Sequence, residues 1–150
     1  MPDEPPFDLV EFLPYLLNQA AEASSRGFQG AYKARYGMLR TEWRVLYHLA
    51  RFGEMSATEL GRRAAIHKTK VSRAVRALEQ KRFVARRPSP EDRRSERLAL
   101  TRAGHEAFRA IAEDARAYDL ALWERFAPGE QAVLRRCLRS LAGAGEGRAD

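Results

Sequence analysis

The chain has 150 residues, which suits one compact domain with a core, or one core with a helical extension. Its apolar fraction of 45% is ordinary for a globular protein, and no run approaches the roughly 20 apolar residues that cross a bilayer. The acidic, proline-rich start is unlike a secretory signal, and the single cysteine, Cys137, excludes an internal disulfide framework. We therefore expect a cytoplasmic protein with no membrane partner.

The net charge of +7 is unevenly distributed along the chain. Residues 62–97 contain 13 Lys and Arg against four acids, a local charge of +9, whereas the remainder carries −2. Such a localised excess of cations is typical of a protein that binds a polyanion. A solvated charged face is the alternative interpretation, but the poor balance of charges within this segment argues against it.

The N-terminal third of the chain is predicted to be helical. Residues 7–13 are expected to form a separate short turn, and a helix should run over 14–36, with Pro14 at a first helical position. Two glycines weaken the continuity of this helix. A second helix is predicted over 42–53, with Thr41 as its N-cap, because apolar residues recur there at helical spacing.

Two helices joined by a tight turn are predicted next. Ser56 and Glu59 form the capping-box pattern S-x-x-E, which opens a short helix that ends near Ala65. After a break at 66–68, another helix should run over 69–82. Its buried stripe consists of Val71, Val75 and Leu78. The opposite face and its flanks carry the polar residues Thr69, Lys70, Ser72, Arg73, Arg76 and Gln80.

The next segment predicts a β-hairpin, with strands at 83–87 and 97–100 and a turn at 88–95. Because a lone hairpin is marginally stable in water, it must pack on the preceding helices. Arg86 and Arg87 are interpreted as phosphate contacts or solvated strand ends rather than as readers of bases.

Two helices close the chain. Thr101 is expected to cap a long helix over 102–126, and a last helix should run over 128–141, with Cys137 buried on its apolar face. The tail 143–150 is expected to be frayed. The sequence therefore predicts mainly α structure with a small β-hairpin.

A short capped helix, a tight turn, a helix with a polar outer face and a basic hairpin together indicate a winged helix-turn-helix. In that fold the first short helix braces the second, which enters the major groove of DNA. Arg73 and Arg76 can each pair with guanine, and Thr69, Lys70 and Ser72 suit contacts near the helix N-terminus. At the hairpin tip, Arg93 and Arg94 suit the negative potential of the minor groove.

The chain also resembles the multiple-antibiotic-resistance regulators, the MarR family. The resemblance rests on R-T-E-W-R-V-L at 40–46, S-A-T-E-L at 56–60, K-V-S-R-A-V-R-A-L-E at 70–79, D-R-R-S at 92–95 and L-A-L-T-R-A-G at 98–104. The last two fit the family's D-x-R wing signature and the L-x-L-T-x-x-G run that follows it. The resemblance covers residues 37–106 closely and the flanking helices loosely.

This resemblance implies an obligate homodimer with a helical dimerisation layer. The DNA-binding lobe would span 37–101, and the dimerisation region 7–36 and 102–142. It also implies that Arg94 enters the minor groove and that Asp92 orients the wing, beside recognition-helix contacts from Thr69, Lys70, Ser72, Arg73 and Arg76. The chain departs from the family at Arg82, where many members have the glycine that suits a left-handed turn. Arg82 makes that turn costly but adds a candidate phosphate contact.

The resemblance further implies a small-molecule effector, because family members commonly lose DNA affinity when an aromatic carboxylate binds between the two regions. An inward Arg44 could bind such a carboxylate bidentately, assisted by Ser24 or Ser25. The alternative for Arg44 is an intramolecular salt bridge or a surface position. Other members sense oxidants through a cysteine in the N-terminal helix, which this chain lacks, so a packing role is favoured for Cys137 over a redox role.

No catalytic motif is found in the chain. It has no phosphate loop, nucleophile elbow, H-E-x-x-H or paired carboxylates, and its three histidines are widely spaced. We therefore expect neither an enzyme nor a metal or other cofactor. The expected function is sequence-specific regulation of transcription, commonly repression, by a homodimer on a pseudo-palindromic DNA site. The alternative is a nonspecific architectural DNA-binding protein, which a specificity ratio would distinguish.

Overall fold

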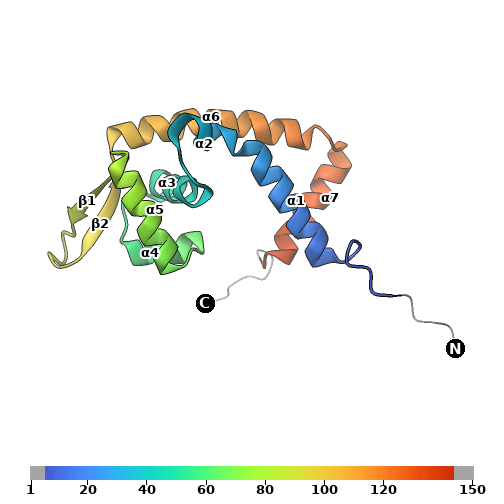
Figure 1. Ribbon diagram of the computed structural model, residues 1–150, viewed down its shortest axis with the longest axis horizontal. Coiled ribbons are helices and arrows are strands. Elements are labelled where there is room, and N and C mark those ends of the chain that lie inside the picture. Colours follow the sequence, from blue (N-terminus) through green and yellow to red (C-terminus); the bar gives the residue numbers. More distant parts are fainter. Residues whose placement is uncertain (1–5, 144–150) are drawn as a thin grey trace. The chain divides into compact units, whose positions relative to one another are not determined.

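Seven helices and one two-stranded antiparallel sheet make up the described residues, 6–143, of the computed structural model (Figure 1). The elements are α1 (Leu13–Phe28), α2 (Gly30–Tyr36), α3 (Arg40–Phe52), α4 (Ala57–Ala64), α5 (Lys68–Gln80), β1 (Val84–Pro88), β2 (Glu96–Leu100), α6 (Arg102–Trp123) and α7 (Pro128–Leu141). The chain divides into two compact units, with the boundary after Ala112. The predicted fold class, mainly α with a β-hairpin, is confirmed.

The N-terminal segment folds as a turn followed by two helices. The turn is confirmed by the Phe12 N–H, which donates to the Leu9 carbonyl at 3.2 Å. The single helix predicted over 14–36 is interrupted at Gln29, whose N–H donates three residues back, to Arg26, at 3.2 Å. This local tightening lies between two glycines, which weaken the helix. Gly37 then ends α2 with a left-handed φ of 63°.

The start of α3 differs from the sequence prediction. Thr41 was expected as the N-cap, but the helix begins at Arg40 with Leu39 as the N-cap residue. The Glu42 carboxylate accepts the Leu39 N–H at 2.9 Å, so an amide without a helical partner is satisfied from inside the helix. This contact replaces the hydroxyl cap that the sequence suggested.

Helices α4 and α5 form the predicted pair. The Ser56 Oγ accepts the Glu59 N–H at 3.1 Å, as the capping pattern indicates. Helix α5 begins one residue earlier than predicted, because His67 acts as its N-cap and accepts the Thr69 N–H at 3.3 Å. The buried stripe of α5 consists of Val71, Ala74, Val75 and Leu78.

The core of the first unit lies where this stripe meets α3 and the hairpin. Its most deeply buried side chains come from α2 to α6, from β2 and from the loops before α3 and α4. They are Tyr32, Met38, Val45, Leu46, Met55, Leu60, Val71, Val75, Leu78, Leu98 and Ile111. Burial of each large apolar side chain contributes about 1.5–3 kcal/mol. The core therefore fixes which face of α5 remains in solvent.

The hairpin pairs Val84 with Leu100 at its base and Pro88 with Glu96 near its tip. A third segment joins it, since Met55 and Leu98 exchange two backbone hydrogen bonds of 3.1 and 2.8 Å. Val84 and Leu98 are buried, so the hairpin packs on the helices as expected. The Met55 bridge was not predicted, because one bridging residue leaves no alternating pattern in the sequence.

The junction between α5, the hairpin and α6 is built around Thr101. Its hydroxyl donates to the Arg82 carbonyl at 2.6 Å and accepts the Gly104 N–H at 3.0 Å, while its own N–H donates to Phe83 at 3.0 Å. A Cβ on Gly104 would lie 2.1 Å from the Phe83 carbonyl oxygen. The T-x-x-G pattern thus provides a hydroxyl cap and a close backbone approach.

The second unit contains the end of α6 and all of α7. Helix α6 ends at Trp123, three residues before the predicted end, and a turn leads to Pro128. The Gln131 amide donates to the Trp123 and Phe126 carbonyls at 2.9 and 3.0 Å, and Arg135 lies 3.8 Å from the Trp123 ring centroid. The turn is therefore closed by side chains of α7.

Cys137 is exposed, so the prediction of a buried cysteine is wrong for the single chain. Helix α7 has no buried residues, and its apolar side chains Val133, Leu138 and Leu141 are 42–56% exposed. The apolar face was identified correctly, but none of the described residues of its own unit buries it. Apart from Gly143, the tail 143–150 lies outside the described residues.

We predict that Gly104→Ala lowers the stability of the protein by about 2–4 kcal/mol, because the new methyl group must displace the Phe83 backbone. Thermal and urea unfolding would measure the loss. Gly129→Ala is the matched control, since a Cβ there meets no atom within 4 Å. Equal stabilities of the two variants would contradict the close approach.

Candidate nucleic-acid interface

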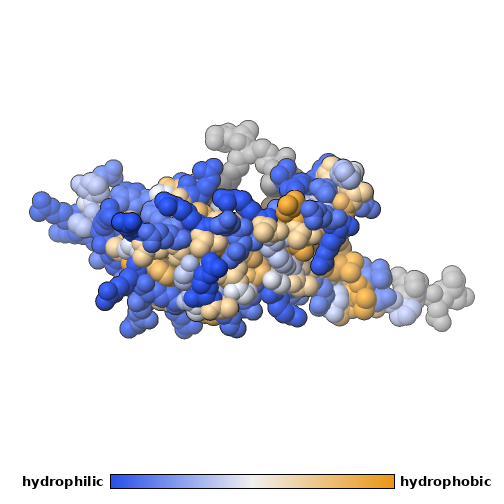
Figure 2. Space-filling view, turned by 90° about the horizontal axis from the view of Figure 1, so that it is seen from above, coloured by the Kyte–Doolittle hydropathy of each residue, from blue (hydrophilic) through white to orange (hydrophobic). Residues whose placement is uncertain are grey.

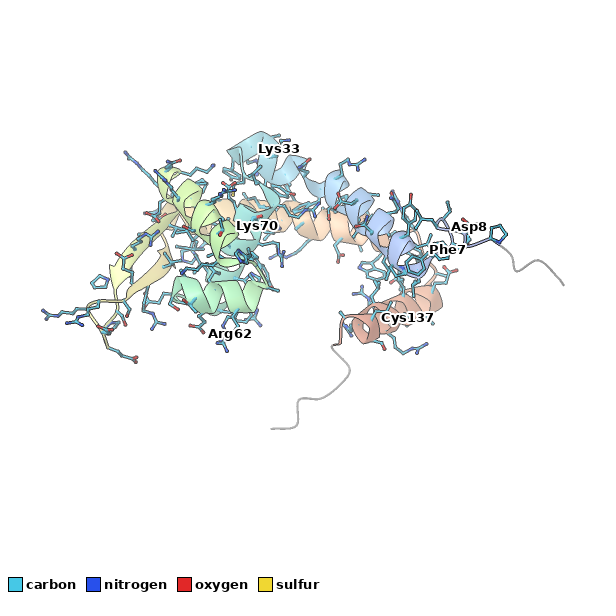
Figure 3. All side chains as sticks on the ribbon, turned by 60° about the horizontal axis from the view of Figure 1, so that its bottom comes forward. Phe7, Asp8, Lys33, Arg62, Lys70 and Cys137 are labelled. Carbon is cyan, nitrogen blue, oxygen red and sulfur yellow. The ribbon has the colours of Figure 1, made fainter. Side chains whose placement is uncertain are left out.

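The outer face of α5 presents all five residues that the sequence proposed for the recognition helix. Thr69, Lys70, Ser72, Arg73 and Arg76 are exposed, while the opposite stripe is buried. Lys70 lies on this helix, and Arg62 extends outward from the neighbouring α4 (Figure 3). The burial pattern alone therefore orients three cations and two hydroxyls toward solvent on one helix.

The first turn of α5 is also suited to an anion. The helix has 13 residues, so its N-terminus carries the partial positive charge of an aligned peptide dipole. Lys68, Thr69 and Lys70 occupy that turn, and no acidic residue lies in it. A phosphate placed there would meet unpaired N–H groups and cationic side chains together.

The wing tip is shaped by Asp92. Its Oδ1 accepts the Arg94 N–H at 2.9 Å, and its carbonyl accepts the N–H and hydroxyl of Ser95, both at 3.1 Å. Arg93 and Arg94 are exposed beside it. In the space-filling view, the wing end of the molecule is covered by hydrophilic residues (Figure 2). Asp92 therefore fixes the backbone of the tip while both guanidinium groups extend into solvent.

Arg86 differs from the sequence interpretation. Its Nε donates to Glu79 of α5 at 2.8 Å, and its Nη1 donates to Glu96 of β2 at 3.0 Å. These contacts with Glu96 and Glu79 raise the pKa of the Arg86 guanidinium above its usual value. Arg86 is therefore paired with two acids while its side chain remains 42% exposed, and Arg87 is exposed as well.

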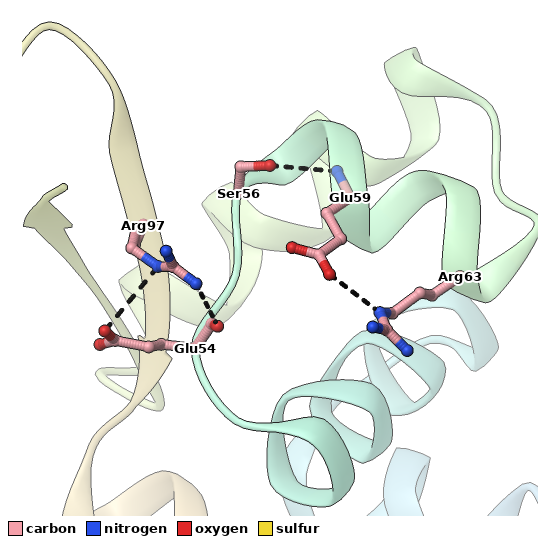
Figure 4. A network of polar contacts seen from close by, with 5 residues as sticks. All are labelled: Glu54, Ser56, Glu59, Arg63 and Arg97. Carbon is pink, nitrogen blue, oxygen red and sulfur yellow. Dashed lines mark hydrogen bonds and ion pairs between the residues drawn. The ribbon is translucent and has the colours of Figure 1, made fainter. Parts of the chain in front are cut away.

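A second arginine ties the hairpin to the loop before α4 (Figure 4). Arg97 donates from Nη2 to the Glu54 carbonyl at 3.0 Å. Its buried Nε lies 3.8 Å from the Glu54 carboxylate, which is an ion pair but too long for a hydrogen bond.

The C-terminal end of α5 is held by an ion pair with α3. Lys81 Nζ lies 3.1 Å from Glu42 Oε1, and the Glu42 side chain is only 5% exposed. Removing Lys81 would leave a buried carboxylate short of its cation, which is costly. The next residue, Arg82, has a left-handed φ of 61°, the conformation that the family resemblance implied at this position.

A surface cavity of about 400 Å³ lies between α4 and α5, beside β1. Its rim includes Arg62, Lys68, Ser72 and Arg86, and Val71 and Val75 contribute apolar surface. The cavity therefore lies beside the exposed cationic face, with a polar rim that suits an anion.

The three candidate effector residues lie on two helices, Ser24 and Ser25 on α1 and Arg44 on α3. The Arg44 guanidinium donates to the Ala64 carbonyl at the end of α4. The Ser24 hydroxyl donates within α1, to the Ala20 carbonyl at 2.8 Å, and Ser25 is half-buried. These hydrogen bonds do not bring Arg44 and Ser24 to a common partner.

An aromatic cluster that sequence reasoning did not assemble surrounds Trp43. The ring centroids of Phe28, Tyr32, Tyr47 and Phe108 lie 5.8–6.5 Å from that of Trp43, with Tyr32 and Phe108 stacked on it. Phe28 and Tyr32 belong to the helix predicted over 14–36, whereas Phe108 belongs to the helix predicted over 102–126. Their convergence depends on the packing of α1, α2, α3 and α6, which the sequence pattern does not contain.

Within residues 6–143, no helix is long and apolar enough to cross a membrane. The same residues hold no group of three or more His, Cys, Asp or Glu side chains arranged to bind a metal.

Comparison with known proteins finds a family model and solved structures to which this chain is similar. Residues 36–95 match the model of the MarR family, and no curated protein sequence matches the chain. A solved structure of the transcriptional regulator PA4135 is 27% identical, with 90% of this chain and 98% of that one covered and a TM-score of 0.76. The MarR family transcriptional regulator SPO1453 from Silicibacter pomeroyi is 25% identical, with 93% and 99% covered and a TM-score of 0.79.

A third structure agrees in fold over nearly the whole chain. It is that of Bordetella bronchiseptica BpsR, and it concerns the regulation of BpsR's DNA binding by 6-hydroxynicotinic acid. The two chains are 21% identical, 97% of this chain and 99% of BpsR are covered, and the TM-score is 0.82. At this identity the likeness shows the shared fold.

We predict that Arg82→Gly raises stability by about 0.5–1 kcal/mol. A left-handed conformation costs a residue with a Cβ about 1–2 kcal/mol, and the backbone freedom of glycine offsets part of that gain. Urea unfolding would measure the change. Arg76→Gly, at an exposed position inside α5, is the control and should destabilise by about 1 kcal/mol. Similar losses in both variants would contradict strain at Arg82.

Proposed function

We infer that this chain, which belongs to the MarR family of transcriptional regulators through residues 36–95, is a sequence-specific DNA-binding repressor. One observation carries the proposal. The exposed cationic face of α5 and the exposed wing tip are fixed to one buried core, in a segment of local charge +9. Such a pair of elements fits one duplex at two grooves.

Helix α5 is the proposed recognition helix. Arg73 and Arg76 reach base edges, where a bidentate arginine–guanine pair gives about 1–3 kcal/mol of discrimination. Thr69, Lys70 and Ser72 bind phosphates or bases near the helix N-terminus. The exposure of all five side chains supports these roles.

The wing is the second proposed contact. Arg94 enters the minor groove, Arg93 lies along the backbone, and Asp92 holds the tip through its hydrogen bond to the Arg94 N–H. This assignment gives Asp92 a structural role near DNA, although its own charge repels phosphate.

The protein acts as a homodimer in this proposal. Apolar side chains are exposed on α1, at Leu13 and Leu16, and on α7, at Val133, Leu138 and Leu141. Exposed apolar surface on helices of a DNA-binding protein supports self-association. Two recognition helices related by a twofold axis would read a pseudo-palindrome with half-sites about one helical turn apart.

An aromatic carboxylate is the proposed effector that releases DNA. The class is that of 6-hydroxynicotinic acid, which regulates the DNA binding of BpsR. The Trp43 cluster offers aromatic faces, and Arg44 offers a guanidinium on the same helix. Arg44 would exchange the Ala64 carbonyl for the carboxylate, because a charge-assisted pair is the stronger contact. Ser24 or Ser25 would assist.

Selection of bound duplexes from random DNA tests the regulatory function. We predict recovery of one pseudo-palindrome, bound about 10³-fold or more tightly than random duplex. Recovery of no preferred sequence, with tight binding to all duplexes, would instead indicate a nonspecific architectural protein.

The selected duplex also tests the wing assignment. Arg94→Ala should weaken binding about tenfold and reduce the slope of log K against log salt by about 0.9 for each protomer, which is about 1.8 for the homodimer. Lys33→Ala, which removes an exposed cation from α2, is the control and should leave both unchanged. Equal effects of the two substitutions would contradict the assignment.

The effector is tested by thermal shift with 6-hydroxynicotinic acid. We predict stabilisation that Arg44→Gln removes, because the carboxylate loses its cation, and that Arg51→Gln on the same helix retains. The corresponding amide, which lacks the carboxylate, should give no shift. Stabilisation that persists in Arg44→Gln would exclude Arg44 as the carboxylate ligand.

A further inference from the structure

Arg86 joins three elements of the DNA-binding lobe through one side chain. It lies on β1, its Nε donates to Glu79 of α5 at 2.8 Å, and its Nη1 donates to Glu96 of β2 at 3.0 Å. The helix proposed to read DNA and both strands of the wing are therefore connected by a single guanidinium group. We name Arg86, Glu79 and Glu96 the wing clamp.

The wing clamp sits where the hairpin leaves the core. Arg86 pairs in register with Leu98, which is buried, and Glu96 lies two residues further toward the tip on the same face. Beyond Arg86, every residue from Arg87 to Glu96 is exposed except Ser89. The clamp is thus the outermost described tie between the wing and α5.

A second tie holds the other face of the hairpin. Arg97 contacts the carbonyl and carboxylate of Glu54, next to the backbone bridge between Met55 and Leu98 (Figure 4). Arg97 is one residue from Leu98, so it points to the opposite face from Arg86. The hairpin is therefore held on one side by α5 and on the other by the loop before α4.

The charge of the wing clamp argues against a direct role in DNA binding. One guanidinium faces two carboxylates, so the group carries a net charge of −1 beside a surface proposed to bind a polyanion. Such acids weaken binding unless they have a structural role there. The forked geometry of arginine allows both contacts at once, which a lysine cannot reproduce.

We propose that Arg86 is a positioning residue, which sets the wing against α5 so that Arg94 meets the minor groove when α5 occupies the major groove. The proposal rests on the proposed function. It assigns to Glu79 and Glu96 a favourable effect on DNA binding, opposite to the effect expected from their charge.

The first test measures binding of a duplex of about 30 base pairs, long enough for two half-sites, by Glu79→Gln and Glu96→Gln. The wing clamp predicts that each substitution weakens binding about threefold or more, although each removes a negative charge. Glu91→Gln, an exposed acid in the wing tip, is the matched control and should bind slightly more tightly. Tighter binding by all three variants would overturn the proposal.

The second test separates positioning from phosphate contact. Arg86→Lys keeps the charge, so a phosphate contact would survive it, whereas the wing clamp predicts the same loss as Arg86→Gln with an unchanged salt slope. In the Arg86→Gln background, Arg94→Ala should cost less than threefold, because the wing is no longer held in place. Full retention of binding by Arg86→Lys, or a full Arg94 effect, would contradict the clamp.

A measurement without DNA distinguishes failure of the clamp from failure of the proposed function. Amide hydrogen exchange of residues 88–96 in the free protein should accelerate in Arg86→Gln and Glu79→Gln but not in Arg87→Gln, which changes the exposed neighbour. Unchanged exchange would overturn the clamp even if the protein binds a specific operator. Accelerated exchange in a protein that binds no DNA would support the clamp and reject only the function.

Discussion

The contact of Gly104 with the Phe83 carbonyl is the constraint on which the arrangement of α5, the hairpin and α6 depends. At that point the segment between α5 and β1 meets the start of α6, and Thr101 makes three hydrogen bonds there, with Arg82, Phe83 and Gly104. Helix α5, the hairpin and helix α6 are therefore joined at one junction. A side chain at position 104 would separate all three, which explains why a threonine and a glycine occur together three residues apart.

Four of the cations in residues 62–97 form ion pairs with acids of the same unit. The ion pairs are Arg63 with Glu59, Lys81 with Glu42, and Arg97 with Glu54. Arg86 pairs with both Glu79 and Glu96. The cations of the α5 face and wing tip are exposed on elements that those pairs hold. The net charge identified the basic segment. Only the structure distinguishes the cations that form ion pairs within the fold from the cations that are exposed on the α5 face and the wing tip.

The sequence predicted most of the fold because the decisive signals were local. Helical spacing located the buried stripe of α5, and S-x-x-E located the start of α4. The errors arose where a distant or competing group decided the outcome. Glu42 replaced Thr41 as the capping group, Met55 joined the hairpin, and Arg86 found acids on two other elements. Cys137 was misjudged because an apolar face does not reveal what covers it.

The wing clamp has a consequence for exchanging parts between related regulators. When the recognition helix of one regulator is transferred to another, the donor helix would normally be chosen only by the exposed side chains that contact bases. Here Glu79 lies on the same helix and fixes the wing through Arg86 and Glu96. A graft that carries new base-reading residues but omits this glutamate would uncouple the two DNA contacts. Under this proposal the helix and the wing form one exchangeable module, which extends at least from the start of α5 to the end of β2 at Leu100.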